Sequence, residues 1–293
     1  MRIIILGAAA GGGLPQWNCG CANCAAARSG RIPPMSQSSI AISADGQAWA
    51  IINASPDIRA QLTATPALHP AGLREMPLRS VLVTNGDIDH VAGLLTLRES
   101  QPFDLFGTET ILGALDANPM MAAVNPDFVP RRPVALDQFF DLLPGLVATL
   151  FAVPGKVPLY LEGEQVETGQ LSENTVGVEL TTGDRRALYI PGCAELPQWL
   201  KSRIEGCDLL MFDGTLWQDG EMIAAGLGHK TGRRMGHMSA DDSIRALAQV
   251  PTGQRIFVHI NNSNPLTDPA SPQSDEARDH GWQIGRDGME ITL

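Results

Sequence analysis

Short apolar runs rich in Ile, Val and Leu recur along this chain, and they constrain its fold more than any other feature of the sequence. Runs of this length, bounded by turn residues, are typical of β-strands. Many are paired across turns such as Asp45-Gly46 and Gly183-Asp184, which favours sheets packed together and covered by helices over a simple βαβ alternation. The predicted strands are residues 2–6, 40–44, 49–53, 81–84, 145–153, 175–180, 186–190, 209–212 and 256–260.

Helical patterns lie between some of these strands. The last of them has an N-terminal signal, because Ser239 and Asp242 stand in capping-box spacing. Proline-rich stretches at 31–39 and 118–133 are predicted surface loops. The length of 293 residues suits one large α/β domain, so we interpret residues 1–293 as a single domain. The predicted helices are residues 91–100, 110–117, 195–204 and 239–249.

The glycine-rich run from Gly7 to Gly13 follows the first strand and has two interpretations. Glycines at this point let a backbone approach a dinucleotide pyrophosphate, but such a loop opens directly into a helix. Here Pro15, Trp17 and a cysteine cluster follow instead. We therefore interpret the run as a tight loop close to a functional site.

The charge balance excludes some classes of partner. The formal net charge is −11, and nucleic acids and anionic membranes both attract proteins with dense Lys and Arg. The apolar run after Met1 is too short for a signal peptide, and no other run approaches the length of a membrane span. Three of the five cysteines cluster, which indicates metal binding in a reducing compartment. We expect a cytoplasmic protein that binds neither nucleic acid nor membrane.

Cys19, Cys21 and Cys24 place three sulfur ligands within one short segment. Thiolates at this spacing favour tetrahedral Zn²⁺, and Gly20 and Asn23 suit a turn around an ion. The alternative is three buried thiols without a metal. A zinc ion whose positions are all filled by protein is structural, so we predict that it fixes the loop after the first strand.

A polar turn with the sequence Thr-Asn-Gly-Asp-Ile-Asp-His, residues 84–90, ends an apolar strand, where functional side chains are often found. It resembles the metallo-β-lactamase superfamily motif Thr-His-x-His-x-Asp-His. Asn85 and Asp87 replace the two leading histidines, whereas Asp89 and His90 are retained. The resemblance implies an α/β fold, the αββα sandwich of two mixed β-sheets covered by helices.

In that superfamily the leading histidines serve one metal and the Asp-His pair serves the second. Other ligands of the first metal are replaced by the segment 154–156 and by Gly192, but the closing histidine is present as His259. The resemblance thus implies Asp89, His90 and His259 as the retained ligands. Two histidines and one carboxylate with open positions form the facial triad of non-haem Fe(II) oxygenases, so we predict Fe(II) with O2 as co-substrate. The alternative is an inactive hydrolase fold with residual polar residues.

Asp213 and His237 lie within the same resemblance. Asp213 follows the strand at 209–212, and His237 stands where related phosphodiesterases carry a histidine near the leaving group. We assign both to the catalytic site, in support of the metal ligands or in proton transfer. Helix-cap and turn chemistry is the alternative.

The match narrows to one family when residues 16–24, 85–90 and 259–265 are combined, because together they resemble the PqqB family of coenzyme PQQ synthesis proteins. That resemblance implies a role in making pyrroloquinoline quinone (PQQ), by Fe(II)- and O2-dependent hydroxylation of the tyrosine ring in a Glu-Tyr-derived precursor. In the phosphodiesterase branch of the superfamily, a histidine three residues beyond the last ligand completes the three-cysteine zinc site. Asn262, a poor zinc ligand, stands at that position here, so the candidates for the fourth ligand are Asn262, water and another side chain.

A precursor with amino-acid carboxylates needs cations in an acidic protein, and Lys230, Arg233 and Arg234 precede His237. We hypothesise that one or more of them bind those carboxylates; a solvated basic loop is the alternative. The expected partners are a small-molecule or dipeptide PQQ precursor and other PQQ pathway proteins. Two other function classes remain open, a carrier of PQQ or its precursor and a metal-dependent hydrolase.

Overall fold

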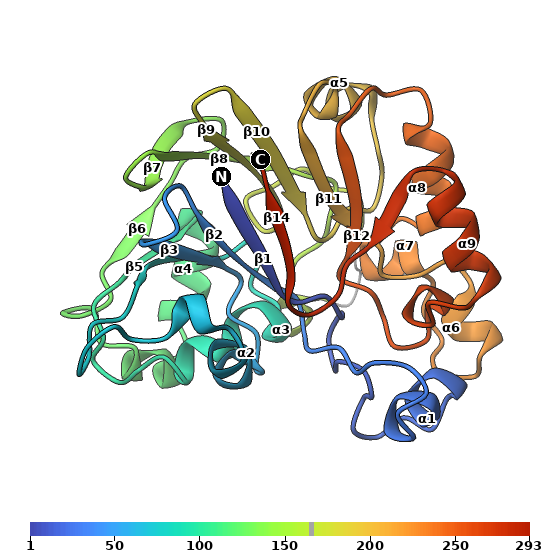
Figure 1. Ribbon diagram of the computed structural model, residues 1–293, viewed down its shortest axis with the longest axis horizontal. Coiled ribbons are helices and arrows are strands. Elements are labelled where there is room, and N and C mark those ends of the chain that lie inside the picture. The colour runs from blue at the N-terminus through green and yellow to red at the C-terminus, as the bar shows by residue number, and fades with distance from the viewer. Residues whose placement is uncertain (164–166) are drawn as a thin grey trace.

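The strands form two mixed seven-stranded sheets that pack against each other, with helices on the outer faces, as predicted (Figure 1). The computed structural model describes residues 1–163 and 167–293. The first sheet has the order β14 (Met289–Thr292), β1 (Arg2–Gly7), β2 (Ser39–Ser43), β3 (Trp49–Ile52), β4 (Leu78–Leu82), β5 (Asp104–Gly107) and β6 (Arg131–Pro133). The second has the order β13 (Trp282–Ile284), β12 (Gln254–Val258), β11 (Leu209–Asp213), β10 (Arg185–Ile190), β9 (Val176–Thr182), β8 (Leu146–Ala152) and β7 (Phe139–Leu143).

The helices are short, and several of them cover the outer faces of the sheets, whereas α1 lies below the sheets in the view of Figure 1. In the described part of the chain, none of them has both the length and the apolar character needed to cross a membrane. The α-helices are α1 (Ala22–Arg28), α2 (Ile58–Ala64), α3 (Ile88–Val91), α4 (Glu109–Asp116), α5 (Gln198–Ile204), α6 (Glu221–Ala224), α7 (Gly232–Met235), α8 (Ala240–Leu247) and α9 (Pro272–Asp279). The 3-10 helices are η1 (Pro66–Leu68), η2 (Ala92–Leu95), η3 (Pro119–Ala123), η4 (Leu159–Leu161) and η5 (Pro265–Thr267).

Central strands are buried on both faces, which explains why their sequences are apolar throughout. In β1, Ile3 and Ile5 pack in the core between the sheets. Their neighbours Ile4 and Leu6 belong to a second core, which includes residues of α2 and α4. Full burial of such a side chain contributes about 1.5–3 kcal/mol, so both layers hold the strand in a single register.

The carboxyl ends of β10, β11 and β12 lie side by side at one end of the second sheet, because these strands are parallel. The loop after β1 reaches the same end, where the Ala10 amide donates to the Ile260 carbonyl at 2.9 Å. Thr215, in the loop after β11, lies there too, because its carbonyl accepts the amide of Asn261, in the loop after β12, at 3.0 Å. Carboxyl ends of parallel strands commonly carry ligand sites, and the fold brings the functional loops together there.

Two predicted helices differ from the structure. The helix expected at 91–100 is replaced by α3 and the 3-10 helix η2, because Gly93 packs against the backbone of residues 54 and 55. A Cβ on Gly93 would lie 2.1 Å from the Ser55 carbonyl oxygen. The helix expected from residue 195 begins only at Gln198, since Pro197 caps it and proline is disfavoured in a helix interior. Strand β5 and the edge strands β6, β7, β13 and β14 were not predicted.

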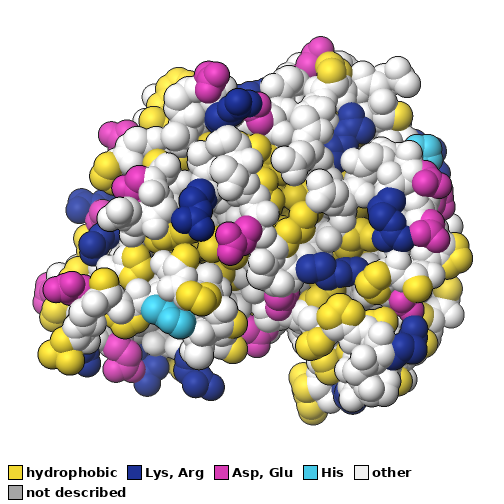
Figure 2. Space-filling view, in the orientation of Figure 1, with side chains coloured by type: hydrophobic (Ala, Val, Ile, Leu, Met, Phe, Trp, Pro, Cys, Tyr) yellow, Lys and Arg dark blue, Asp and Glu magenta, His cyan; other side chains and the backbone are white. Residues whose placement is uncertain are grey.

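Charges of both signs are mixed on the surface. Figure 2 shows Lys and Arg side chains interspersed with Asp and Glu over the face in view, without a continuous basic patch there. Salt bridges join many of these charges, such as Arg132 with Asp104 at 2.8 Å. This face offers no field of one sign for a polyanion.

Candidate metal centre

His90 is held by the turn that follows β4. Its Nδ1 lies 2.8 Å from Oδ1 of Asn85, which also accepts the Asp87 amide at 3.0 Å. An amide oxygen only accepts, so the ring carries its proton on Nδ1 and leaves a lone pair on Nε2. That Nε2 atom is buried and has no hydrogen-bond partner among the described residues. Asn85 thus orients the histidine instead of replacing a lost one as a ligand.

Asp89 follows β4 of the first sheet and His259 follows β12 of the second, and both lie close to Nε2 of His90. Oδ2 of Asp89 lies 3.8 Å from His90 Nε2 and 3.1 Å from His259 Nε2. One ligand atom from each of the three residues lies within 4.8 Å of the others. His259 follows β12 with a left-handed backbone, φ 55°, a conformation that costs about 1–3 kcal/mol for a residue other than glycine. The sequence-predicted ligands are therefore brought together.

The charges of this trio suit a cation. Burial lowers the pKa of His90 to about 4, so its imidazole is neutral near neutral pH and its lone pair is available. Burial opposes ionisation of Asp89, but the adjacent His90 and His259 hold its pKa below the usual range. One carboxylate, one neutral imidazole with an orphaned nitrogen and a second imidazole form a donor set that fits a divalent transition metal.

Two positions where the superfamily carries other ligands are at or beside glycines here. A Cβ on Gly192 would lie 3.5 Å from Cε1 of His237, an ordinary van der Waals contact, so the imidazole lies beside this glycine. A Cβ on Gly155 would lie 2.6 Å from Thr175, so a side chain there would require its neighbours to move. Among the described residues, Asp213, His237 and His259 form a second group of possible metal ligands, which shares His259 with the first.

Asp213 and His237 form a hydrogen-bonded pair beside the trio. Oδ2 of Asp213 lies 2.8 Å from Nδ1 of His237 and accepts the Cys193 amide at 2.9 Å. Asp213 is fully buried. The His237 ring stacks on His259, with centroids 5.1 Å apart and planes at 20°. Because Asp213 takes the Nδ1 proton, Nε2 of His237 carries a lone pair beside the metal centre.

A cavity of about 320 Å³ opens onto both groups. Its charged walls are Asp87 and Asp89 on one hand, and Lys156 and Lys230 on the other. Apolar side chains complete it, so it offers both a surface for a ring and cations for carboxylates. The lining residues are Ala10, Gly11, Asn85, Asp87, Asp89, Lys156, Leu159, Thr215, Met222, Lys230, Met235, His237, His259 and Asn261.

The three basic residues predicted to bind substrate carboxylates do not lie at one place in the structure. Lys230 lines the cavity. Arg234 lies 3.7 Å from Glu162, which also pairs with Lys156 at 2.8 Å. Arg233 is not among the described residues that line the cavity.

Sequence reasoning did not single out Lys156, Thr215 or Met222 as site residues. Lys156 lies in the segment 154–156, where the superfamily carries a metal ligand, and Thr215 stands two residues after Asp213. The sequence therefore offered a reason to consider both positions. The contact of Met222 with the cavity has no local signal in the sequence.

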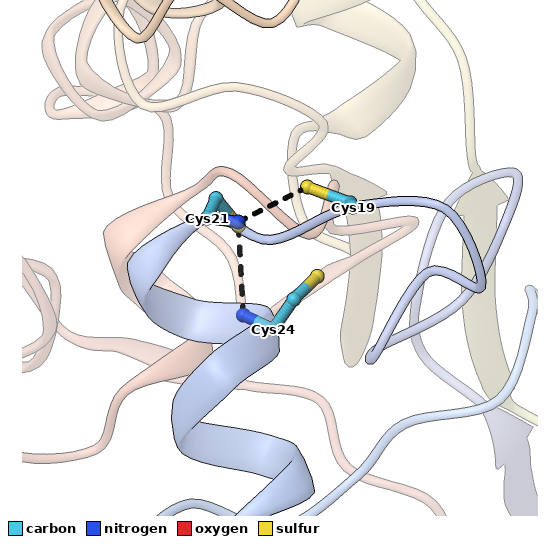
Figure 3. Close-up of side chains that lie close together, drawn as sticks. All are labelled: Cys19, Cys21 and Cys24. Carbon is cyan, nitrogen blue, oxygen red and sulfur yellow. Dashed lines mark hydrogen bonds between the residues drawn. The ribbon is translucent and has the colours of Figure 1, made fainter.

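The three cysteines form a second group at the start of α1 (Figure 3). Cys21 caps the helix and Cys24 lies in its first turn, while Cys19 comes from the incoming loop. Their sulfurs lie within 4.8 Å of one another. Nδ2 of Asn262 lies 3.3 Å from the sulfurs of Cys19 and Cys24 and 3.6 Å from that of Cys21. The loop after β12 therefore brings Asn262 to the cluster, where its NH2 group faces the sulfurs as a hydrogen-bond donor.

The chain is similar to known proteins in sequence and in structure. A family model described as a beta-lactamase superfamily domain matches residues 48–260. Coenzyme PQQ synthesis protein B of Ruegeria pomeroyi is 56% identical over 296 residues, with 100% of both chains covered. The same protein of Methylobacterium radiotolerans is 54% identical over 299 residues, again with 100% of both covered.

This chain belongs to the coenzyme PQQ synthesis protein B family. A solved PqqB structure from Methylobacterium extorquens, described as Zn²⁺-bound, is 50% identical, has a TM-score of 0.98 and covers 100% of both chains. A diphosphatase of the PhnP family shares the fold, with a TM-score of 0.69 at 20% identity over 99% of this chain and 97% of that one. The PqqB family is thus a branch of the metallo-β-lactamase fold.

Proposed function

We propose that this PqqB family member is an Fe(II)- and O2-dependent hydroxylase that acts on the tyrosine ring of a Glu-Tyr-derived precursor of PQQ. Family membership supports a role in PQQ biosynthesis, and the fold with its donor set supports a metal-dependent enzyme. The observation that carries the proposal is the trio of Asp89, His90 and His259, with a buried, unpartnered His90 Nε2. A two-histidine, one-carboxylate set leaves positions open for O2 and substrate.

The reaction replaces a ring C–H bond with C–OH. One oxygen atom of O2 enters the ring and the other leaves as water, with two electrons and two protons taken from an external reductant such as ascorbate. Fe(II), when bound by Asp89, His90 and His259, supplies the activation of O2. The ring carbon that gains oxygen loses its proton, and Nε2 of His237 is the candidate acceptor because Asp213 holds Nδ1–H.

The cavity walls suit the proposed substrate. Met222, Met235 and Leu159 offer apolar contact for an aromatic ring, and Lys156 and Lys230 offer cations for carboxylates. Lys230 is exposed at the cavity wall and is available to a carboxylate, whereas Lys156 already pairs with Glu162 at 2.8 Å. Lys230 is therefore the first candidate for binding a substrate carboxylate.

The test is oxygen uptake by the protein loaded anaerobically with Fe(II). Addition of O2, ascorbate and a tyrosine-derived dicarboxylate should give uptake coupled to a product heavier by one oxygen atom. The His90→Ala variant and the zinc-loaded protein serve as controls. Uptake no greater than that of His90→Ala would overturn the proposal. Turnover by the zinc form without O2 would indicate a hydrolase instead, and PQQ binding that survives His90→Ala and His259→Ala would indicate a carrier.

Replacement of Lys230 with alanine is expected to raise the KM for a dicarboxylate substrate about tenfold or more, since hydrogen bonds to charged groups contribute roughly 1.5–3 kcal/mol. The metal content should not change, because Lys230 is not one of the predicted metal ligands. Arg233→Ala is the matched control, since Arg233 stands on the same segment but does not line the cavity among the described residues. Steady-state kinetics measure both. An equal rise in both variants would assign the effect to the general charge of the loop.

A further inference from the structure

The hydroxyl of Thr215 lies between the metal trio and the Asp213–His237 pair. Its Oγ1 is 2.8 Å from His259 Nδ1, 3.0 Å from His237 Nδ1 and 2.6 Å from Oδ1 of Asp213. It is also 3.0 Å from the His259 carbonyl oxygen. Thr215 is 4% exposed. One buried side chain thus touches a metal ligand and both members of the pair.

The direction of these hydrogen bonds follows from the single hydroxyl proton. Two oxygens only 2.6 Å apart require a proton between them, so Thr215 donates to Asp213 Oδ1. The hydroxyl oxygen then only accepts toward the histidines. His259 must therefore carry a proton on Nδ1. Its Nε2 lies 3.1 Å from Oδ2 of Asp89 and donates to it, so a metal ion held by these two atoms would take the place of that proton.

The position of Thr215 is itself fixed on several sides. Its amide donates to Asp213 Oδ1 at 3.0 Å, and its carbonyl accepts the Asn261 amide at 3.0 Å. Nδ2 of Asn264 donates to the same carbonyl at 3.4 Å. The hydroxyl cannot follow His259 if the ring turns, so the contact constrains the ring and not the reverse.

We propose that Thr215 is a positioning residue for the metal centre: its hydroxyl fixes His259 in the tautomer whose Nε2 binds the metal and couples that ligand to the Asp213–His237 pair. Groups that hold the second nitrogen of a metal-bound histidine set its tautomer and ring orientation. Asn85 does this for His90 and Thr215 does it for His259. The inference concerns metal binding and stands whether or not the bound metal activates O2.

The test compares Thr215→Val, which keeps the shape without the hydroxyl, with Thr215→Ser, which keeps the hydroxyl. Metal-free protein is titrated with Co²⁺, whose weak ligand-field bands report the histidine and carboxylate site and whose thiolate charge-transfer bands report the cysteine site. Thr215→Val should weaken Co²⁺ binding at the histidine site about 10–100-fold. Thr215→Ser should bind within a few-fold of the wild type, and both variants should keep the thiolate bands.

A second measurement reads the tautomer directly. In the ¹⁵N spectrum of zinc-loaded protein, the Nδ1–H signal of His259 should be present in the wild type and in Thr215→Ser and lost by exchange in Thr215→Val. Wild-type affinity in Thr215→Val, or affinity in Thr215→Ser as weak as in Thr215→Val, would overturn the inference. If Thr215→Val does not fold, as judged by its thermal melt, Thr215→Ala takes its place with the same expected loss. Absence of O2 uptake in the wild type would contradict the hydroxylase proposal but not this inference.

Discussion

Replacement of His237 with alanine is expected to lower the rate of O2-dependent turnover by about 10²–10⁴-fold, the usual contribution of a positioned acid or base. The expectation rests on the pair with Asp213, whose carboxylate fixes the Nδ1 proton at 2.8 Å and leaves Nε2 free. His237 also lines the cavity and stacks on His259. The active-site metal should remain bound, because the predicted ligands are Asp89, His90 and His259.

Single-turnover rates and metal content together test this expectation. Asp213→Asn should lower the rate in the same direction, since an amide can present an N–H to Nδ1 and favour the other tautomer of His237. His280→Ala, a histidine on the surface after α9, is the matched control and should be unchanged. A His237→Ala rate within a few-fold of the wild type, with metal bound, would remove His237 from proton transfer.

Replacement of Cys24 with serine is expected to abolish zinc binding at the cysteine cluster and to loosen the segment around α1. A helix of seven residues is too short to be stable alone. Besides the cysteine cluster, Arg28 ties it down by donating to the carbonyls of Cys19 and Gln16. Loss of several kcal/mol of metal-linked stability should lower the Tm by about 10 °C or more, at roughly 2–4 °C per kcal/mol.

Zinc content by mass spectrometry and limited proteolysis measure the outcome. Cleavage should appear first between the glycine-rich loop and residue 31. Cys19 and Cys24 also pack in the core between the sheets, so part of the fall in Tm will come from that packing. Cys207→Ala is the control, since Cys207 is a buried thiol outside the cluster. Zinc content equal to the wild type in Cys24→Ser would contradict a three-cysteine site. Asn262→Ala, with the three sulfurs intact, should weaken zinc binding less than Cys24→Ser, because it removes hydrogen bonds from Nδ2 to the sulfurs and leaves the thiolates in place.

The sequence by itself determined the central strands, because residues buried on both faces must be apolar at every position. The run at β1, with Ile3 and Ile5 in one core and Ile4 in the other, is such a case. Edge strands such as β6 and β13 escaped prediction since they are only three residues long and carry little periodic signal. Local spacing also identified the cysteine cluster, and the turn after β4 identified Asp89 and His90.

Only the tertiary structure decided how these parts act together. Asp89 and His259 are 170 positions apart in the chain, and their contact depends on which strand ends share an edge. The same packing placed Lys156 in the cavity and gave Thr215 its three polar partners. Local sequence specifies which residue types can bind a metal. The identity of the groups that orient those ligands depends on long-range contacts, which no local pattern encodes.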